Sequence, residues 1–193
     1  MCKLTTKILT AIFLLAISSA AFAHPGHSIS GLAAGLMHPF SGLDHLLAIL
    51  AVGLWAAQGG GRKVWLLPAT FMVMLVIGAG VAVQWQTLPL VETGIATSVL
   101  ALGLLIALSL QFPVALSVII TALFGLMHGY AHGLELPDSA SPFAYALGFL
   151  VATATLHLNG IAIGAATLQR GTQLSRLFGG AIAISGVYLL TSN

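Results

Sequence analysis

Two short segments of this chain combine histidines with a carboxylate inside apolar sequence. The first runs from His38 to His45 and reads His-Pro-Phe-Ser-Gly-Leu-Asp-His; the second runs from His128 to Glu135 and reads His-Gly-Tyr-Ala-His-Gly-Leu-Glu. Placing an acidic side chain at the centre of a membrane helix costs about 3 kcal/mol, so such residues usually serve a function. Imidazole nitrogens and carboxylate oxygens are ligands that divalent transition metals accept. The two segments therefore predict a metal-ion site within a membrane protein.

The first segment also predicts a break in its helix. His38 and His45 are seven residues apart, so they project from nearly the same face of a helix. Pro39 removes one backbone hydrogen bond and Gly42 follows three residues later, so we expect a kink or a short unwound stretch near Pro39. Such a break would turn Asp44 toward the two histidines, as in transporters that build ion sites from broken helices. The alternative is that Pro39 and Gly42 serve helix packing alone and that His38 is a polar residue at the membrane interface.

The second segment places three candidate ligands on one helix face. His128, His132 and Glu135 are spaced i, i+4 and i+7. Two histidines one turn apart can bind a single ion, and Glu135 adds an anionic oxygen. The alternative is a polar helix end at the headgroup layer. Both segments fall in the outer halves of their predicted spans, so they are placed to share one site.

The composition excludes a soluble globular domain. The chain is 59% hydrophobic and 5% charged, whereas soluble domains contain about 25% charged residues. The formal net charge of +2 is too small to indicate a nucleic-acid partner. The expected surroundings are the lipid bilayer, and 193 residues allow one membrane domain. The one cysteine is Cys2, so the rest of the chain offers no thiolate ligand and no disulfide.

The first residues have the pattern of a cleavable signal peptide. Lys3 and Lys7 give a basic start, an apolar run follows over Ile8–Ile17, and Ala21-Phe22-Ala23 forms a cleavage site with small residues. An uncleaved anchor helix is the alternative. The expected division of the chain is a signal peptide over 1–23 and a six-helix membrane domain over 24–193.

Six further apolar stretches are each near the roughly 20 residues that a bilayer demands. They predict an all-α membrane protein with the spans 30–57, 64–85, 91–110, 113–134, 142–168 and 174–191. Lys and Arg in short loops face the cytoplasm. Arg62 and Lys63 lie in the first joint, and Arg170 and Arg176 flank the fifth. The charges therefore predict that both ends of the mature chain lie on the periplasmic side.

Three more histidines are secondary candidates for metal ligation. After cleavage, His24 would carry a free α-amine, and with His27 it would form a capture site for the ion. The alternative is a chain end with incidental histidines. His157 lies in the fifth predicted span, where a lone histidine is more often a hydrogen-bond partner between helices than a ligand.

The two segments together resemble a known family. His38 to His45 fits the HPxxGxDH signature of the HupE/UreJ family of bacterial nickel and cobalt permeases. Met127 to Glu135 fits its second signature, FHGxAHGxE, with Met127 in place of Phe and every potential ligand retained. The resemblance implies secondary permeation of Ni2+, or of Co2+, across the inner membrane, with urease or hydrogenase as the enzymes supplied. Imidazole and carboxylate ligands by themselves suit nickel, cobalt and zinc alike.

These observations lead to a permease that is not an enzyme and that binds no permanent cofactor. Its transported ion would contact a set of six metal ligands: His38, Asp44, His45, His128, His132 and Glu135. The sequence has no G-x-x-x-x-G-K-[ST] loop, so ATP hydrolysis is not expected. Two alternatives stay open: a membrane accessory protein for metalloenzyme maturation that does not transport, and an intramembrane metal- or haem-dependent enzyme.

Overall fold

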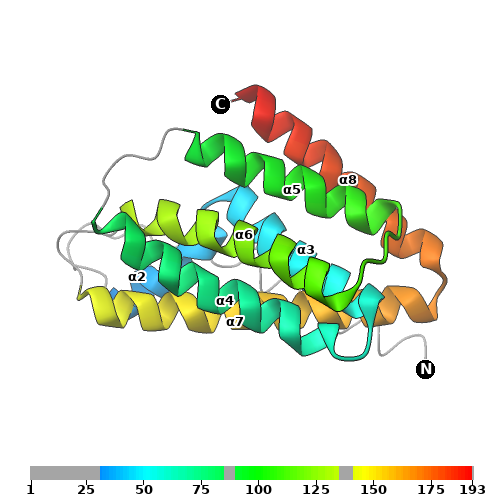
Figure 1. The fold of residues 1–193 in the computed structure, drawn as a ribbon, viewed down its shortest axis with the longest axis horizontal. Coiled ribbons are helices and arrows are strands. Elements are labelled where there is room, and N and C mark those ends of the chain that lie inside the picture. Colours follow the sequence, from blue (N-terminus) through cyan, green and yellow to red (C-terminus); the bar gives the residue numbers. More distant parts are fainter. Residues whose placement is uncertain (1–30, 85–89, 135–140, 193) are drawn as a thin grey trace.

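The computed structural model describes residues 31–84, 90–134 and 141–192, and over these residues all regular secondary structure is helical (Figure 1). The helices are α2 (Gly31–Met37), the short 3-10 helix η2 (His38–Phe40), α3 (Leu43–Gly59), α4 (Lys63–Ala82), α5 (Val91–Ala107), α6 (Val114–Leu134), α7 (Pro142–Gln169) and α8 (Thr172–Ser192). The all-α prediction is confirmed for the described part of the chain. The predicted signal peptide over 1–23 lies outside it.

The helix lengths support a membrane protein, but fewer of the described helices than the six predicted are long enough to span a bilayer. Four of the described helices, α4, α6, α7 and α8, are long and apolar enough to cross a bilayer, and α2 with α3 makes a fifth if the pair is one broken span. Helix α5 is apolar but has 17 residues. The predicted total of six spans is therefore not confirmed by length and composition.

Helix α5 is shorter than the predicted span 91–110 because its C-terminus is capped early. Ser109 adopts a left-handed conformation with φ 54°. The backbone N–H of Leu110 then donates to the carbonyl of Leu105, and that of Ser109 donates to Ile106. This is the hydrogen-bond pattern of a Schellman motif, which satisfies the last carbonyls and ends the helix.

The break predicted near Pro39 is confirmed. The segments Gly31–Phe40 and Leu43–Gly59 are bent by 78° relative to each other. Pro39 has no N–H to continue the helix, and Gly42 is extended, with φ −109° and ψ 125°. The carbonyl of His38 accepts hydrogen bonds from the Ser41 hydroxyl at 2.6 Å and from the Ser41 N–H at 3.0 Å. The break is thus stabilised by local hydrogen bonds rather than left unsatisfied in the membrane.

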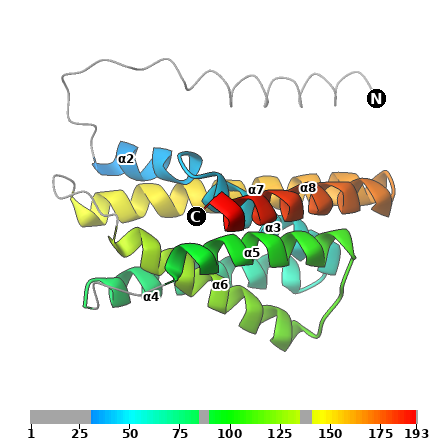
Figure 2. The same cartoon turned by 90° about the horizontal axis from the view of Figure 1, so that it is seen from above.

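Glycines bring the helices into close pairs. A Cβ atom at Gly78 of α4 would collide with the carbonyl oxygen of Leu126, and one at Gly129 of α6 would collide with that of Leu75. Glycines make similarly close approaches between α3 and α7, between α2 and α7, and between α5 and α8. Figure 2 shows α2 lying along the first half of α7 and α4 lying along α6. Small residues at such seams let van der Waals packing hold helices together where lipid removes the hydrophobic driving force.

The two ends of the helical bundle differ in charge. Near the C-terminal end of α5, the Lys63 ammonium donates to the carbonyl of Phe112 at 2.6 Å, and Nε of Arg176 donates to the carbonyl of Ala107 at 2.8 Å. Near the N-terminal end of α5, Glu92 shares a pocket with Asp44. Cationic and anionic side chains of the described residues therefore mark opposite ends of α5.

The glycine seam between α4 and α6 yields a test with a control on the same helix. Gly78→Ala should destabilise the protein by about 1–3 kcal/mol because its methyl group overpacks the seam. Gly80→Ala should be neutral or stabilising by up to about 1 kcal/mol, since a Cβ there meets nothing within 4 Å. Thermal unfolding of the detergent-solubilised protein measures both. Equal midpoints for the two variants would show that the seam is not tightly packed.

Candidate metal-ion site

The two histidine segments meet in the folded chain. His38 Nε2 lies 2.9 Å from His132 Nδ1, which is a hydrogen bond between the two imidazoles. The ring centroid of His45 lies 4.2 Å from that of His132 and 5.3 Å from that of His128. We call these four side chains the imidazole cluster. Residues more than 80 positions apart in the sequence thus form one group of potential metal ligands.

Helix α6 positions two histidines of the cluster, and the break between η2 and α3 positions the other two. His128 and His132 project from one face of α6 because they are one turn apart, and both are buried. His38 is the first residue of η2, and His45 lies in the first turn of α3, so the two histidines lie on opposite sides of the helix break. Aromatic rings from α7 cover the cluster: the Phe149 ring is 4.3 Å from His132, and the Tyr145 ring is 5.7 Å from His38.

Asp44 fixes the tautomer of its neighbour His45. Its Oδ1 accepts a hydrogen bond from the His45 backbone N–H at 2.7 Å and lies 2.6 Å from His45 Nδ1. Because an ionised carboxylate only accepts, Nδ1 carries the proton, and Nε2 of a neutral ring keeps its lone pair. That Nε2 is buried and has no hydrogen-bond partner among the described residues. A histidine oriented by a carboxylate in this way is a common arrangement in metal sites. The carboxylate itself lies in the first turn of α3, where the helix dipole favours negative charge.

His128 has the same tautomer for a different reason. Its Nδ1 lies 2.8 Å from the carbonyl oxygen of Phe124, one turn earlier on α6. A carbonyl can only accept, so Nδ1 carries the proton. Nε2 of His128 is also buried without a hydrogen-bond partner in the described part of the chain. His45 and His128 therefore each retain a lone pair with which to bind a cation.

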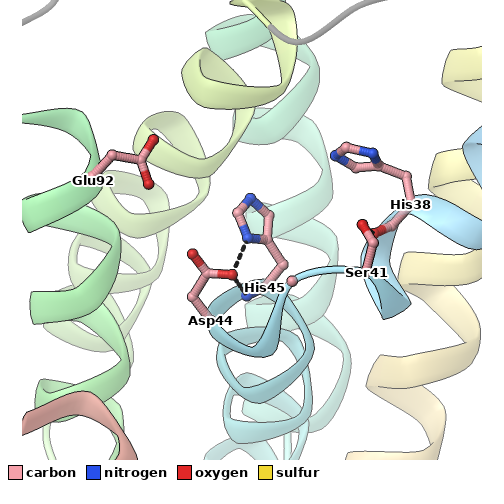
Figure 3. Close-up of a pocket in the computed structure, with 6 residues that line it drawn as sticks. His38, Ser41, Asp44, His45 and Glu92 are labelled. Carbon is pink, nitrogen blue, oxygen red and sulfur yellow. Dashed lines mark hydrogen bonds and ion pairs between the residues drawn. The ribbon is translucent and has the colours of Figure 1, made fainter. Parts of the chain in front are cut away.

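A polar pocket of about 230 Å³ adjoins the cluster. It is lined by His38, Ser41, Gly42, Asp44, His45 and Glu92. Figure 3 shows Glu92 and His38 directed into this pocket from opposite sides, with Asp44 and His45 between them. Glu92 comes from the first turn of α5 and was not among the predicted ligands. The available signal was that it is one of only four acidic residues in the chain.

Four of the predicted ligands are not among the described residues of the cluster and its pocket. Glu135, His24 and His27 lie outside the described residues. His157 lies elsewhere on α7, with Nδ1 2.9 Å from the carbonyl oxygen of Ile49. The ligation predicted for these residues stays a prediction.

The cluster is not arranged as a closed coordination site. Among the described residues, no three His, Cys, Asp or Glu side chains are placed to hold one ion together. The reason is visible in the hydrogen bonds: His38 is bonded to His132, and His45 is bonded to Asp44. An ion that binds all four rings must replace the bond between His38 and His132 by rotating at least one of them.

Long apolar helices around buried imidazoles and an acidic pocket define a multi-pass membrane protein with a candidate cation site. The sequence model of the HupE / UreJ protein family matches residues 12–189. Protein HupE of Rhizobium leguminosarum bv. viciae is 42% identical over 186 residues, which cover 96% of this chain and 97% of that protein. The chain therefore belongs to the HupE / UreJ family, as its two motifs indicated. No solved structure matches it.

The assigned tautomers can be tested without any metal. In protein labelled with 15N-histidine, the neutral rings of His45 and His128 should show a protonated Nδ1 and a bare Nε2, each identified by substituting one histidine. Asp44→Ala should change the tautomer balance of His45 and leave His128 unaffected, because the latter donates to a backbone carbonyl. A protonated Nε2 on both rings of the unmodified protein would contradict the assignment.

Proposed function

We propose that this chain is a secondary permease that carries Ni2+, or Co2+, from the periplasm to the cytoplasm across the inner membrane. The observation that carries the proposal is the meeting of the two motifs: four imidazoles gather beside a pocket that also holds Asp44 and Glu92. Family membership supports it, because the motifs are those of the family of nickel and cobalt permeases described above. Nickel is the substrate in this proposal, and the protein is a transporter rather than an enzyme.

The pocket suits the capture of a divalent cation. Its two carboxylates attract the ion electrostatically and offset its charge as it loses water. Imidazole nitrogens then replace the lost water ligands, since neutral imidazole is a good ligand for Ni2+ and Co2+. His38, Asp44, His45, His128 and His132 would supply the ligands, joined by Glu92 and Glu135. Binding must stay weak enough for release, as in any conducting site.

The orientation follows from the charges at the two ends. Lys and Arg side chains of a membrane protein are enriched on its cytoplasmic side. The end with Lys63 and Arg176 therefore faces the cytoplasm, and the pocket faces the periplasm. In this arrangement α5 is a short sixth span, and both ends of the mature chain are periplasmic after cleavage of the signal peptide over 1–23. The delivered nickel would supply urease or hydrogenase.

Uptake of radiolabelled Ni2+ into cells that express the chain tests this proposal. Asp44→Asn should lower uptake by at least about tenfold, because it removes a negative charge beside the captured ion. Asp138→Asn makes the same change at the other aspartate of the chain, which belongs to neither motif, and should leave uptake intact. Competition by Co2+ and Zn2+ establishes the preferred ion.

Two outcomes would contradict the proposal. Normal uptake by Asp44→Asn would remove the pocket from the transport path. No uptake by the unmodified protein, once its insertion in the membrane is shown by immunoblotting, would exclude a permease and favour an accessory role in metalloenzyme maturation.

A further inference from the structure

A second group of buried polar atoms, which have no hydrogen-bond partner among the described residues, lies beyond the imidazole cluster, toward the cytoplasmic end of the proposed path. Thr153 and His157 lie one turn apart on α7, and both are buried, at 0% and 1% exposure. Phe149, which contacts His132, precedes Thr153 by one turn on the same helix. Phe149, Thr153 and His157 therefore form a stripe along α7 that begins at the cluster and runs away from it.

His157 has the same tautomer as His45 and His128. Its Nδ1 lies 2.9 Å from the carbonyl oxygen of Ile49, so Nδ1 carries the proton and Nε2 keeps its lone pair. That Nε2 is buried and has no hydrogen-bond partner among the described residues. Ile49 follows His45 by four residues on α3, which is one turn and about 6 Å along the helix. His157 therefore lies about one helical turn further along α3 than the cluster does.

The aromatic ring of Phe71 packs against both His157 and His128 of the cluster. The fully buried ring of Phe71 has its centroid 5.4 Å from that of His128 and 5.3 Å from that of His157. The hydroxyl of Thr153 is likewise buried without a hydrogen-bond partner in the described part of the chain. A buried polar group without a partner costs about 1–3 kcal/mol. Several such groups in one region mark a place where a bound ion or an ordered water would satisfy them.

We propose that His157 Nε2 and Thr153 Oγ1, together with His128 Nε2, form an inner transit site for the transported divalent cation, with the Phe71 ring packed against both imidazoles. This inference rests on the proposed function and extends it with a second binding site for the ion along the transport path. His128 belongs to both sites, so the ion passes from the cluster to His157 without leaving imidazole ligands. The donation of His157 Nδ1–H to a backbone carbonyl is the support that ligating histidines usually have.

The inner site binds the ion more weakly than the outer one. The outer pocket contains the carboxylates of Asp44 and Glu92, whereas the inner site has two neutral imidazoles and a hydroxyl. Weaker binding at the second site favours onward movement and release, because permeation needs sites that the ion can leave. The asymmetry gives the path a capture step and a release step.

Substitutions on α7 separate a ligand role of His157 from a structural one. In His157→Asn, the side-chain amide N–H can still donate to the carbonyl of Ile49, but the Nε2 ligand is lost. Thr153→Val removes the buried hydroxyl with little change in shape. Thr155→Val is its matched control, since the exposed Thr155 hydroxyl only donates to Val151 of its own helix.

The initial rate of Ni2+ uptake is measured against Ni2+ concentration, per molecule of inserted protein. The maximal rate should fall by about tenfold in His157→Asn and by a smaller factor in Thr153→Val, while KM stays within about twofold because the outer pocket is intact. Thr155→Val should match the unmodified protein. A normal maximal rate per inserted His157→Asn molecule overturns the inner site while leaving the permease proposal standing.

A binding measurement tests the inner site even if the chain shows no uptake. Asp44→Ala weakens the outer pocket, so the inner site accounts for a larger share of the Ni2+ that the purified variant still binds in equilibrium dialysis. Adding His157→Asn to that variant should lower the residual binding. Equal binding by the single and double variants overturns the inner site independently of transport.

Discussion

The candidate site depends on a helix break that the membrane would otherwise penalise. Ending α2 and starting α3 at membrane depth leaves backbone groups that lipid cannot satisfy. The protein solves this with Ser41, which donates twice to the His38 carbonyl, and with Gly42, whose extended backbone redirects the chain. The resulting bend of 78° brings His45 into ring contact with α6. The same bend exposes the first turn of α3 to the acidic pocket.

Hydrogen bonds from the Nδ1 atoms give three of the buried histidines, His45, His128 and His157, the same tautomer. His45 donates to a carboxylate, and His128 and His157 donate to backbone carbonyls. In each case the proton is held away from Nε2, so the lone pair remains available for a cation. A histidine placed only for packing would gain stability by satisfying both nitrogens. Three buried rings that each leave Nε2 without a partner in the described structure are better suited to a passing ion than to a permanent core.

Much of this arrangement could be predicted from local chemistry. The break follows from Pro39 and Gly42, and the shared face of His128 and His132 follows from helical periodicity. Glu92 was not predicted as a site residue because it stands alone in the sequence, with no second ligand near it. The hydrogen bond of Asp44 was also not predicted: its Oδ1 supports His45 while the side chain lines the pocket. Such details depend on which helices are neighbours.

The sequence by itself determined an all-helical membrane protein, the position of the break, the family and the four histidines of the cluster, because composition, proline and helical spacing act locally. The tertiary structure alone decided that both motifs meet, that Glu92 joins them, and that the Phe71 ring packs against both His128 and His157. The physical reason is the close packing of helix pairs. Glycines such as Gly78, Gly129 and Gly160 let the backbones of two helices approach closely. The sequence of one helix does not reveal which other helix packs against its glycines.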